Sequence, residues 1–167
     1  MAKVTFKGNP MTLVGNEVKV GEQAPNFTVL DSGLQEKTLA DYEGKTIVIS
    51  VIPSIDTGVC EQQTKRFNEE AAKLDNVQVL TISADLPFAQ KRWCAAEGVD
   101  NLEMLSDHRD FSFAQSFGVG MKELRLLARA VFVIDDKGTI QHAEYVEEAT
   151  NHPDYDNALA QVNSLIK

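Results

Sequence analysis

The sequence of 167 residues lacks the features of several large protein classes. It has two cysteines and no Cys-x-x-Cys pair, which excludes a disulfide framework and disfavours a dithiol reductase of the thioredoxin type. The histidines show no ligand spacing to either cysteine, although a zinc site needs four closely grouped ligands. We therefore expect no metal and no cofactor. We also expect His108, His142 and His152 to lie at the surface.

The chain also lacks long apolar runs and positive charge. No run approaches the roughly 20 residues of a membrane span. The N-terminal sequence MAKVTFKGNP has no apolar core of a secretory signal. Lys and Arg number 16 against 25 Asp and Glu, and the net charge of −9 argues against nucleic acids and anionic membranes. Without repeats or linkers, residues 1–167 are expected to form a single cytoplasmic domain.

The most informative stretch is Lys45 to Phe67, KTIVISVIPSIDTGVCEQQTKRF. Thr46 to Ile52 is a nearly unbroken run of β-branched apolar residues, typical of a strand buried on both faces. Pro53 ends this strand, and a short loop with several candidate N-cap residues follows. A helix is expected next, because apolar and small residues recur along one face. That face contains Cys60, Thr64, Phe67, Ala71 and Leu74.

Cys60 is thus predicted in the first turn of a helix that follows a central strand. Unpaired N–H groups and the helix dipole favour the anion at such a position, and the thiolate is the nucleophilic form of cysteine. The alternative is that Cys60 is a small buried hydrophobic residue. The strand–loop–helix context favours the reactive interpretation, because α/β folds place their chemistry at the carboxyl ends of strands.

The remaining chain alternates strands with helices in its middle and forms hairpins at both ends. Residues 1–16 are expected to contain an N-terminal hairpin, from Val4 to Phe6 and Met11 to Val14. Further strands are expected within 21–31 and at 36–39, 77–83, 102–105, 130–134 and 139–146. Further helices are expected from Pro87, capped by Asp85, to near Gly98, at 111–117 and at 153–166. This order predicts an α/β fold with a mixed central sheet flanked by helices.

Three segments carry a family resemblance. Pro53, Thr57 and Cys60 match the P-x-x-x-T-x-x-C pattern of peroxiredoxins, and PSIDTGVC resembles the Tpx-type thiol peroxidases, the bacterial branch of that family. The segments SADLPFAQKRWC, ending at Cys94, and LLARAVFVID, around Arg129, are similar to the same branch. The similarity extends over essentially the whole chain. It implies a thioredoxin-like fold, in agreement with the order of the predicted elements.

The resemblance also implies an activity. In this family the cysteine matching Cys60 attacks the peroxide, and the cysteine matching Cys94 resolves the product as a disulfide within one chain. The expected enzyme is an atypical two-cysteine peroxiredoxin that reduces hydrogen peroxide and alkyl hydroperoxides. Thioredoxin is the usual reductant in the family, and the family tends to form homodimers.

Three further site residues follow from the matched segments. By resemblance, Thr57 supplies a hydroxyl near the sulfur, although a helix cap would also explain it. Pro53 shields the sulfur from water, although it also simply ends a strand. Arg129 begins a core strand, where its charge is costly unless paired, and a guanidinium aimed at the Cys60 thiolate would satisfy it. Arg125 is close enough in sequence that spacing alone does not exclude it; the matched segment favours Arg129 and a surface position for Arg125.

Two other functions remain open. The chain could be a redox sensor that passes its disulfide to a regulatory partner, or a binding module with inert cysteines. Steady-state peroxide consumption separates the enzyme from the sensor, and the reactivity of Cys60 in the native state separates both from the binding module. Leu86, Pro87 and Phe88 are explained equally well by a hydrophobic approach for organic peroxides and by a packed helix start.

Overall fold

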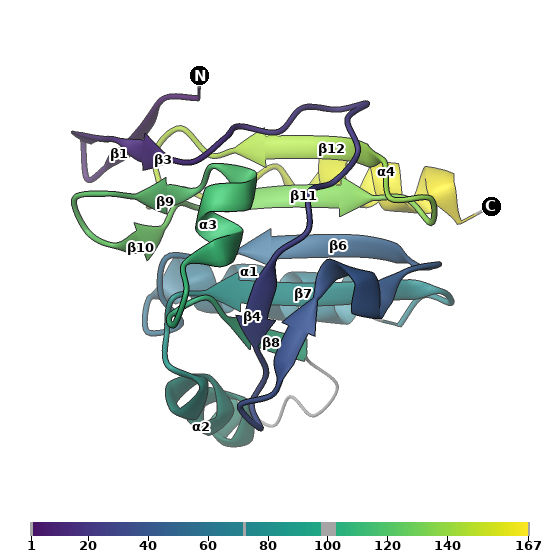
Figure 1. Cartoon of the computed structure of the whole chain (residues 1–167), viewed down its shortest axis with the longest axis horizontal. Coiled ribbons are helices and arrows are strands. Elements are labelled where there is room, and N and C mark those ends of the chain that lie inside the picture. Colours follow the sequence, from purple (N-terminus) through teal and green to yellow (C-terminus); the bar gives the residue numbers. More distant parts are fainter. Residues whose placement is uncertain (1, 72, 98–102, 167) are drawn as a thin grey trace.

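The computed structural model describes residues 2–71, 73–97 and 103–166, and its centre is a mixed sheet with helices on both faces (Figure 1). The strand order in this seven-stranded sheet is β12-β11-β6-β7-β8-β4-β5. The strands are β4 Thr28–Leu30, β5 Glu36–Thr38, β6 Thr46–Val51, β7 Val77–Ser83, β8 Glu103–Ser106, β11 Ala130–Ile134 and β12 Ile140–Tyr145. The helices are η1 Leu39–Tyr42, α1 Gly58–Glu70, α2 Pro87–Glu97, α3 Ser112–Phe117 and α4 Tyr155–Leu165. The predicted thioredoxin-like α/β fold is confirmed.

The central strand β6 explains the unbroken apolar run in the sequence. It pairs in parallel with β7 and antiparallel with β11, and all six of its residues are buried. Side chains alternate between the two faces of a strand. Ile47, Ile49 and Val51 therefore enter the core on one face, and Val48 enters the core on the other. Both faces must be apolar because both are covered.

The two cores use different helices. On one face, α3 contributes Phe113 and Phe117, which stack with ring centroids 4.7 Å apart and contact Phe27 and Phe132 edge to face. On the opposite face, α1 and α4 pack against the sheet, and Figure 1 shows both helices behind it. Gly118 ends α3 in the left-handed conformation that a helix C-terminus commonly needs, as predicted.

The N-terminal hairpin is confirmed, with β1 Val4–Phe6 paired to β2 Asn9–Met11. The expected second strand, Met11 to Val14, is divided. Leu13–Val14 forms β3, which joins β9 Gly120–Met121 and β10 Leu126–Leu127 in a separate three-stranded sheet. The division falls at Thr12, whose backbone binds Glu123 and Lys122 instead of continuing the hairpin.

Two expectations need correction. His142 is only 9% exposed, because it lies on β12 beneath α4, and burial lowers its pKa. His108 and His152 are exposed as predicted. Asp85 does not bind the first turn of α2 in the described part of the chain: its carboxylate bonds to Ser54, Ile55 and Ser83.

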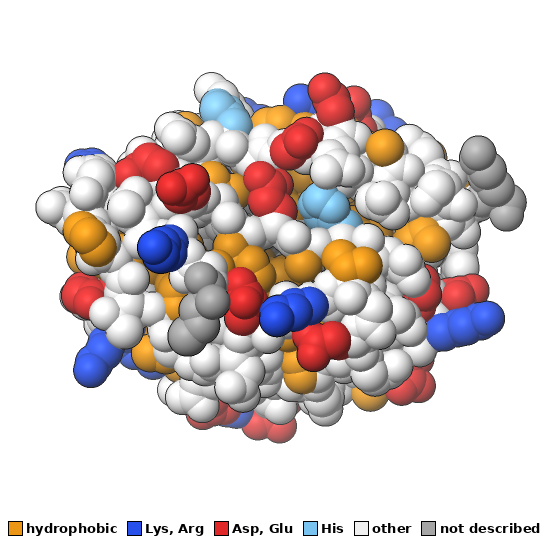
Figure 2. Space-filling model, turned by 90° about the horizontal axis from the view of Figure 1, so that it is seen from above, with side chains coloured by type: hydrophobic (Ala, Val, Ile, Leu, Met, Phe, Trp, Pro, Cys, Tyr) orange, Lys and Arg blue, Asp and Glu red, His pale blue; other side chains and the backbone are white. Residues whose placement is uncertain are grey.

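Two predicted boundaries, at Gly98 and Leu102, lie outside the described residues. Within those residues, no helix is long and apolar enough to cross a membrane. Acidic and basic side chains are interspersed over the face shown in Figure 2, which looks onto the molecule from above. The organisation of residues 1–167 as a single domain stays a prediction.

Candidate active site

Cys60 lies where the sequence predicts, in the first turn of α1 beyond the carboxyl end of β6. Thr57 is the N-cap residue of α1, and its Oγ1 accepts the Cys60 N–H at 3.4 Å, a long hydrogen bond. The hydroxyl of Thr57 also faces the Ser54 carbonyl at 3.4 Å. Pro53 is buried just after the strand. The Cys60 side chain is fully buried in an apolar cluster with Ile52 and Ile55.

Arg129 is the predicted residue that the structure brings to the Cys60 sulfur. It directly precedes β11, which pairs with β6, and only 2% of its surface is exposed. Its Nη2 lies 3.2 Å from Cys60 Sγ, its Nη1 donates to Gln63 Oε1 at 2.9 Å, and its Nε donates to the Ala149 carbonyl at 2.8 Å. Three nitrogens of one buried guanidinium therefore have partners on two different segments, α1 and the chain after β12.

The charge of this buried guanidinium needs a counter-charge. No carboxylate lies within salt-bridge distance of Arg129 in the described segments 2–71, 73–97 and 103–166. The Ala149 carbonyl and the Gln63 amide are neutral, and among its three partners only the Cys60 sulfur can become an anion. Burial makes an unpaired charge costly. The geometry therefore pairs the guanidinium of Arg129 with the sulfur of Cys60.

Gln63 and Ser50 belong to this network, although the sequence analysis did not single them out. Gln63 is fully buried one turn after Cys60, and its Nε2 donates to Ser50 Oγ at 2.9 Å and to the Val51 carbonyl at 3.3 Å. Ser50 interrupts the apolar run of β6 on the face covered by α1. A glutamine three residues after a candidate nucleophile, on its helix face, is a signal that could have found this contact.

Asp85 holds the loop between β6 and α1. Its Oδ2 accepts the Ile55 N–H at 2.8 Å and the Ser83 hydroxyl at 2.7 Å, and its Oδ1 accepts the Ser54 hydroxyl at 3.4 Å. Ser83 is the last residue of the neighbouring strand β7. The carboxylate thus ties the Cys60 loop to the sheet.

Cys94 is half-buried on α2 and reaches the same apolar cluster as Cys60. It packs with Trp93 against Ile52, Ile55, Cys60 and Met104, and its Sγ lies 3.4 Å from Met104 Sδ. Burial raises the pKa of the Cys94 thiol, so the thiol is protonated at neutral pH. Both cysteines are free. They lie on different helices, as predicted.

The alternative arginine has other partners. Arg125 is exposed, donates to the His108 carbonyl at 3.1 Å and stacks on the Phe111 ring at 4.2 Å. At the start of α2, Pro87 is buried, whereas Leu86 and Phe88 are 47% and 68% exposed. In the part of the chain that the structure describes, no group of three or more His, Cys, Asp or Glu residues could hold a metal ion.

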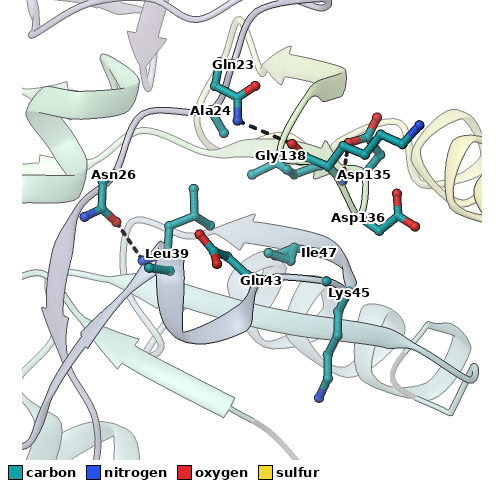
Figure 3. A pocket seen from close by; sticks show the side chains of 14 residues that line it. Gln23, Ala24, Asn26, Leu39, Glu43, Lys45, Ile47, Asp135, Asp136 and Gly138 are labelled. Atoms are coloured by element: carbon teal, nitrogen blue, oxygen red, sulfur yellow. Dashed lines mark hydrogen bonds between the residues drawn. The ribbon is translucent and has the colours of Figure 1, made fainter.

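A pocket of about 650 Å³ lies away from the cysteines (Figure 3). Its wall includes Lys45 and Ile47 at the start of β6, and Asp135 to Gly138 after β11. These residues lie at the end of β6 opposite to Cys60. None of the predicted site residues lines this pocket.

Comparisons with known proteins agree with the geometry. Residues 19–159 match the protein family described as Redoxin. The chain is 66% identical over 167 residues to a thiol peroxidase of Bacillus subtilis (strain 168), covering 100% of both chains. It is 58% identical over 165 residues to a thiol peroxidase of Staphylococcus aureus (strain MRSA252), covering 99% of this chain and 100% of the relative.

Solved structures give the same result. The fold is similar to a peroxiredoxin-like protein from Aquifex aeolicus, with a TM-score of 0.92, 43% identity and coverage of 99% of this chain and 98% of that chain. A thiol peroxidase from Chromobacterium violaceum has a TM-score of 0.85 at 18% identity, covering 98% of this chain and 96% of that chain. The second similarity concerns the fold alone.

Proposed function

The chain belongs to the redoxin family, in its branch of Tpx-type thiol peroxidases, and from this premise we propose that Cys60 reduces peroxides with Cys94 as its resolving partner. The protein is a thiol-specific peroxidase of the peroxiredoxin type. The observation that carries the assignment of its nucleophile is the 3.2 Å contact between Arg129 Nη2 and Cys60 Sγ inside a buried site.

In the first step the Cys60 thiolate attacks one oxygen of the peroxide R–O–O–H. A sulfur–oxygen bond forms and the oxygen–oxygen bond breaks. Cys60 becomes a sulfenic acid and the departing oxygen leaves as water or an alcohol after taking a proton. Arg129 keeps its positive charge throughout and steadies the charge that develops on the oxygens. Thr57 offers the hydroxyl that can turn from its capping role toward the peroxide.

In the second step the Cys94 thiol condenses with the Cys60 sulfenic acid, which gives a disulfide and releases water. A dithiol of the thioredoxin type then reduces the disulfide, becomes oxidised itself and restores both thiols. Peroxide substrates and a reductant of this type follow from the family. Thioredoxin as the physiological reductant is part of the proposal.

The disulfide requires a movement of α2. Cα atoms joined by a disulfide lie within about 7 Å, a distance that two packed helices seldom offer. In α2 only Pro87 and Gln90 are buried, whereas α1 buries Cys60, Gln63, Thr64 and Phe67. Elements that bury few residues open most easily. We therefore expect the Cys94 segment of α2 to unfold locally and α1 to move less.

This expectation gives a prediction for Cys94→Ser. One equivalent of hydrogen peroxide should convert wild type to a monomeric Cys60–Cys94 disulfide, whereas the variant should stop at the sulfenic acid. Trp93, the only tryptophan, packs in the same cluster and should report the opening of α2. Its emission should change in wild type on oxidation and recover with reductant, and it should stay unchanged in the variant.

Two results would contradict the prediction for Cys94. One is a disulfide-linked dimer of oxidised wild type on a non-reducing gel. The other is an oxidised structure in which α2 superposes on its reduced position through Cys94. Cys94→Ala provides a matched control, because it also removes the thiol but leaves no hydroxyl beside Met104.

The function itself is tested by steady-state turnover. Wild type with thioredoxin, thioredoxin reductase and NADPH should consume hydrogen peroxide and tert-butyl hydroperoxide continuously. A single stoichiometric oxidation without turnover would instead favour a protein that passes its disulfide to a regulatory partner. Slow reaction of native Cys60 with both peroxide and iodoacetamide would favour a binding module.

Three further statements belong to the proposal. We infer a homodimer, as is common in the family, and sedimentation of the reduced protein tests it. The expected cytoplasmic location would keep both thiols reduced between turnovers. Residues 1–167 then act as one domain, of which residues 1–16 are an extension.

A further inference from the structure

The N-terminal hairpin, Val4 to Met11, lies against residues 147–150, and the Ala149 carbonyl of this segment binds Arg129. Thr5 N–H donates to the Glu147 carbonyl at 2.7 Å, and Ala149 N–H donates to the Thr5 carbonyl at 2.8 Å. Thr5 and Glu148 form an isolated parallel bridge. Ala149 is the residue whose carbonyl accepts Arg129 Nε at 2.8 Å. The backbone of β1 is therefore two hydrogen bonds away from the guanidinium that contacts Cys60.

This supporting segment has little structure of its own. Residues 147–150 follow β12 and belong to no helix or longer strand. Ala149 is fully buried in a small core with Val4, Met121 and Ala128, and Val4 comes from the hairpin. Because two backbone bonds and the Val4 part of this packing come from β1, the hairpin contributes to fixing where the Ala149 carbonyl points.

Glu148 fastens the hairpin to the segment from the other side. Its carboxylate accepts the backbone N–H groups of Lys7 and Gly8 at 3.1 and 2.8 Å and the Thr5 hydroxyl at 2.8 Å. Lys7 and Gly8 form the hairpin turn with φ of 52° and 81°, as in a type I′ turn. This turn directs both N–H groups at one carboxylate.

The same carboxylate also binds its own segment. It accepts the Thr150 N–H at 3.0 Å and the Thr150 hydroxyl at 2.7 Å. The bonds from the Thr150 hydroxyl and from the N–H groups of Gly8 and Thr150 hold the pKa of Glu148 well below its usual range. Glu148 is therefore ionised at neutral pH and joins hairpin and segment through five hydrogen bonds.

We propose that Glu148 is a positioning residue for peroxide reduction: by clamping the N-terminal hairpin to residues 147–150, it holds the Ala149 carbonyl that orients Arg129 toward Cys60. This inference rests on the proposed role of Arg129. An error of about 1 Å in the placement of a catalytic group can cost up to about 100-fold in rate. A loosened segment therefore slows the chemistry without removing any group from the site.

The test uses Glu148→Gln in the full chain. The glutamine amide keeps the size of the side chain. Its NH₂ group, however, is itself a donor and cannot accept hydrogen bonds from the N–H and hydroxyl groups that bind this carboxylate oxygen in wild type. The matched control is Glu123→Gln. Glu123 accepts the N–H and hydroxyl of Thr12 at 2.8 and 2.7 Å, next to the same hairpin, and makes no contact with residues 147–150 among the described hydrogen bonds.

The readout is the rate at which Cys60 is oxidised by hydrogen peroxide in a single turnover. We expect Glu148→Gln to slow this step about tenfold. This value lies between no change in rate and the roughly 100-fold loss that a fully misplaced catalytic group can cause. Glu123→Gln should keep the wild-type rate even where its melting temperature falls. Thr150→Val, which removes only one donor, should slow oxidation less and in the same direction.

A double-mutant cycle separates positioning from general destabilisation. In the Arg129→Ala background, Glu148→Gln should cause no further slowing, because it acts through the guanidinium. Equal slowing in both backgrounds, or equal slowing by the Glu123 and Glu148 variants, would overturn the proposal. If Arg129→Ala alone reacts at the wild-type rate, the proposed role of Arg129 fails, whereas peroxide reduction by Cys60 is tested separately by Cys60→Ser. If only Arg129→Ala is slow, this inference alone fails.

Discussion

Replacement of Cys60 by serine is expected to reduce peroxide turnover to the uncatalysed rate. A serine hydroxyl in this position cannot supply the thiolate that attacks the peroxide, and it has no oxidation chemistry that leads to a disulfide. The fold should remain, because the substitution changes one fully buried atom and leaves an acceptor for Arg129. The measurement is steady-state consumption of hydrogen peroxide with a thioredoxin system.

Cys94→Ser is the matched control for this variant. It removes the other thiol but leaves the nucleophile, so it should still react once with peroxide at a rate close to that of wild type. Circular dichroism and the melting temperature establish that both variants are folded. More than a trace of turnover in folded Cys60→Ser would show that the nucleophile has been assigned wrongly.

The second large effect is expected for Arg129→Ala. Loss of one preorganised contact to the transition state commonly costs about 10²–10³ in rate. Here the substitution also removes the positive charge beside the buried Cys60 sulfur, so the reactivity of Cys60 should fall further. Single-turnover oxidation of Cys60, followed by mass spectrometry of samples quenched at short times, measures the combined effect.

The control for Arg129→Ala is Arg125→Ala, because Arg125 is exposed and stacks on Phe111 outside the site. It should oxidise at the wild-type rate. Arg129→Ala should also lower stability, because the Ala149 carbonyl and Gln63 Oε1 lose their partner, at about 1–3 kcal/mol for each buried group left unpaired. The rates are therefore compared well below the melting temperature of the variant. A slow Arg125→Ala with a normal Arg129→Ala would reverse the assignment.

The position of Cys60 was predictable because local patterns determine it. The β-branched run from Thr46 is long enough to require a buried strand, and Thr57 is followed by a helical pattern that needs an N-cap. The structure places Arg129 beside the Cys60 sulfur and Arg125 beside the His108 carbonyl. The choice between them came from the matched segment, because spacing along the sequence allowed both residues.

Polar residues in the core were harder to predict. In the sequence, Gln63 resembles a residue on a solvated helix face, and Ser50 resembles a residue of an ordinary strand. Their contact is evident only when the packing of α1 on β6 is known. His142 was wrongly expected at the surface, because its burial depends on α4, which begins 13 residues later and folds back over β12. Average exposure by residue type carries no information about such tertiary packing.

The support of Arg129 from a distance was also invisible in the sequence. Thr5 and Glu148 are separated by 143 positions and meet only after the hairpin has docked. The two-residue strands β3, β9 and β10 are likewise too short to leave a periodic pattern. Contacts of this kind depend on the whole fold, whereas helix caps and buried strands depend on neighbouring residues.

The central claim is that the Cys60 sulfur is the atom that reacts with peroxide. The most direct test is to find which cysteine carries the oxygen that is first transferred from the peroxide. Cys94→Ser is treated with one equivalent of hydrogen peroxide in the presence of dimedone, which traps sulfenic acids, and the peptides are examined by mass spectrometry. The account predicts the dimedone adduct on Cys60. It also predicts that the double variant Cys94→Ser/Arg129→Ala lacks this adduct when its reaction is stopped at the same short time. Two results would contradict this account. One is that Cys94→Ser consumes peroxide while its Cys60 stays unmodified. The other is that wild type forms an adduct on Cys94 before any change at Cys60.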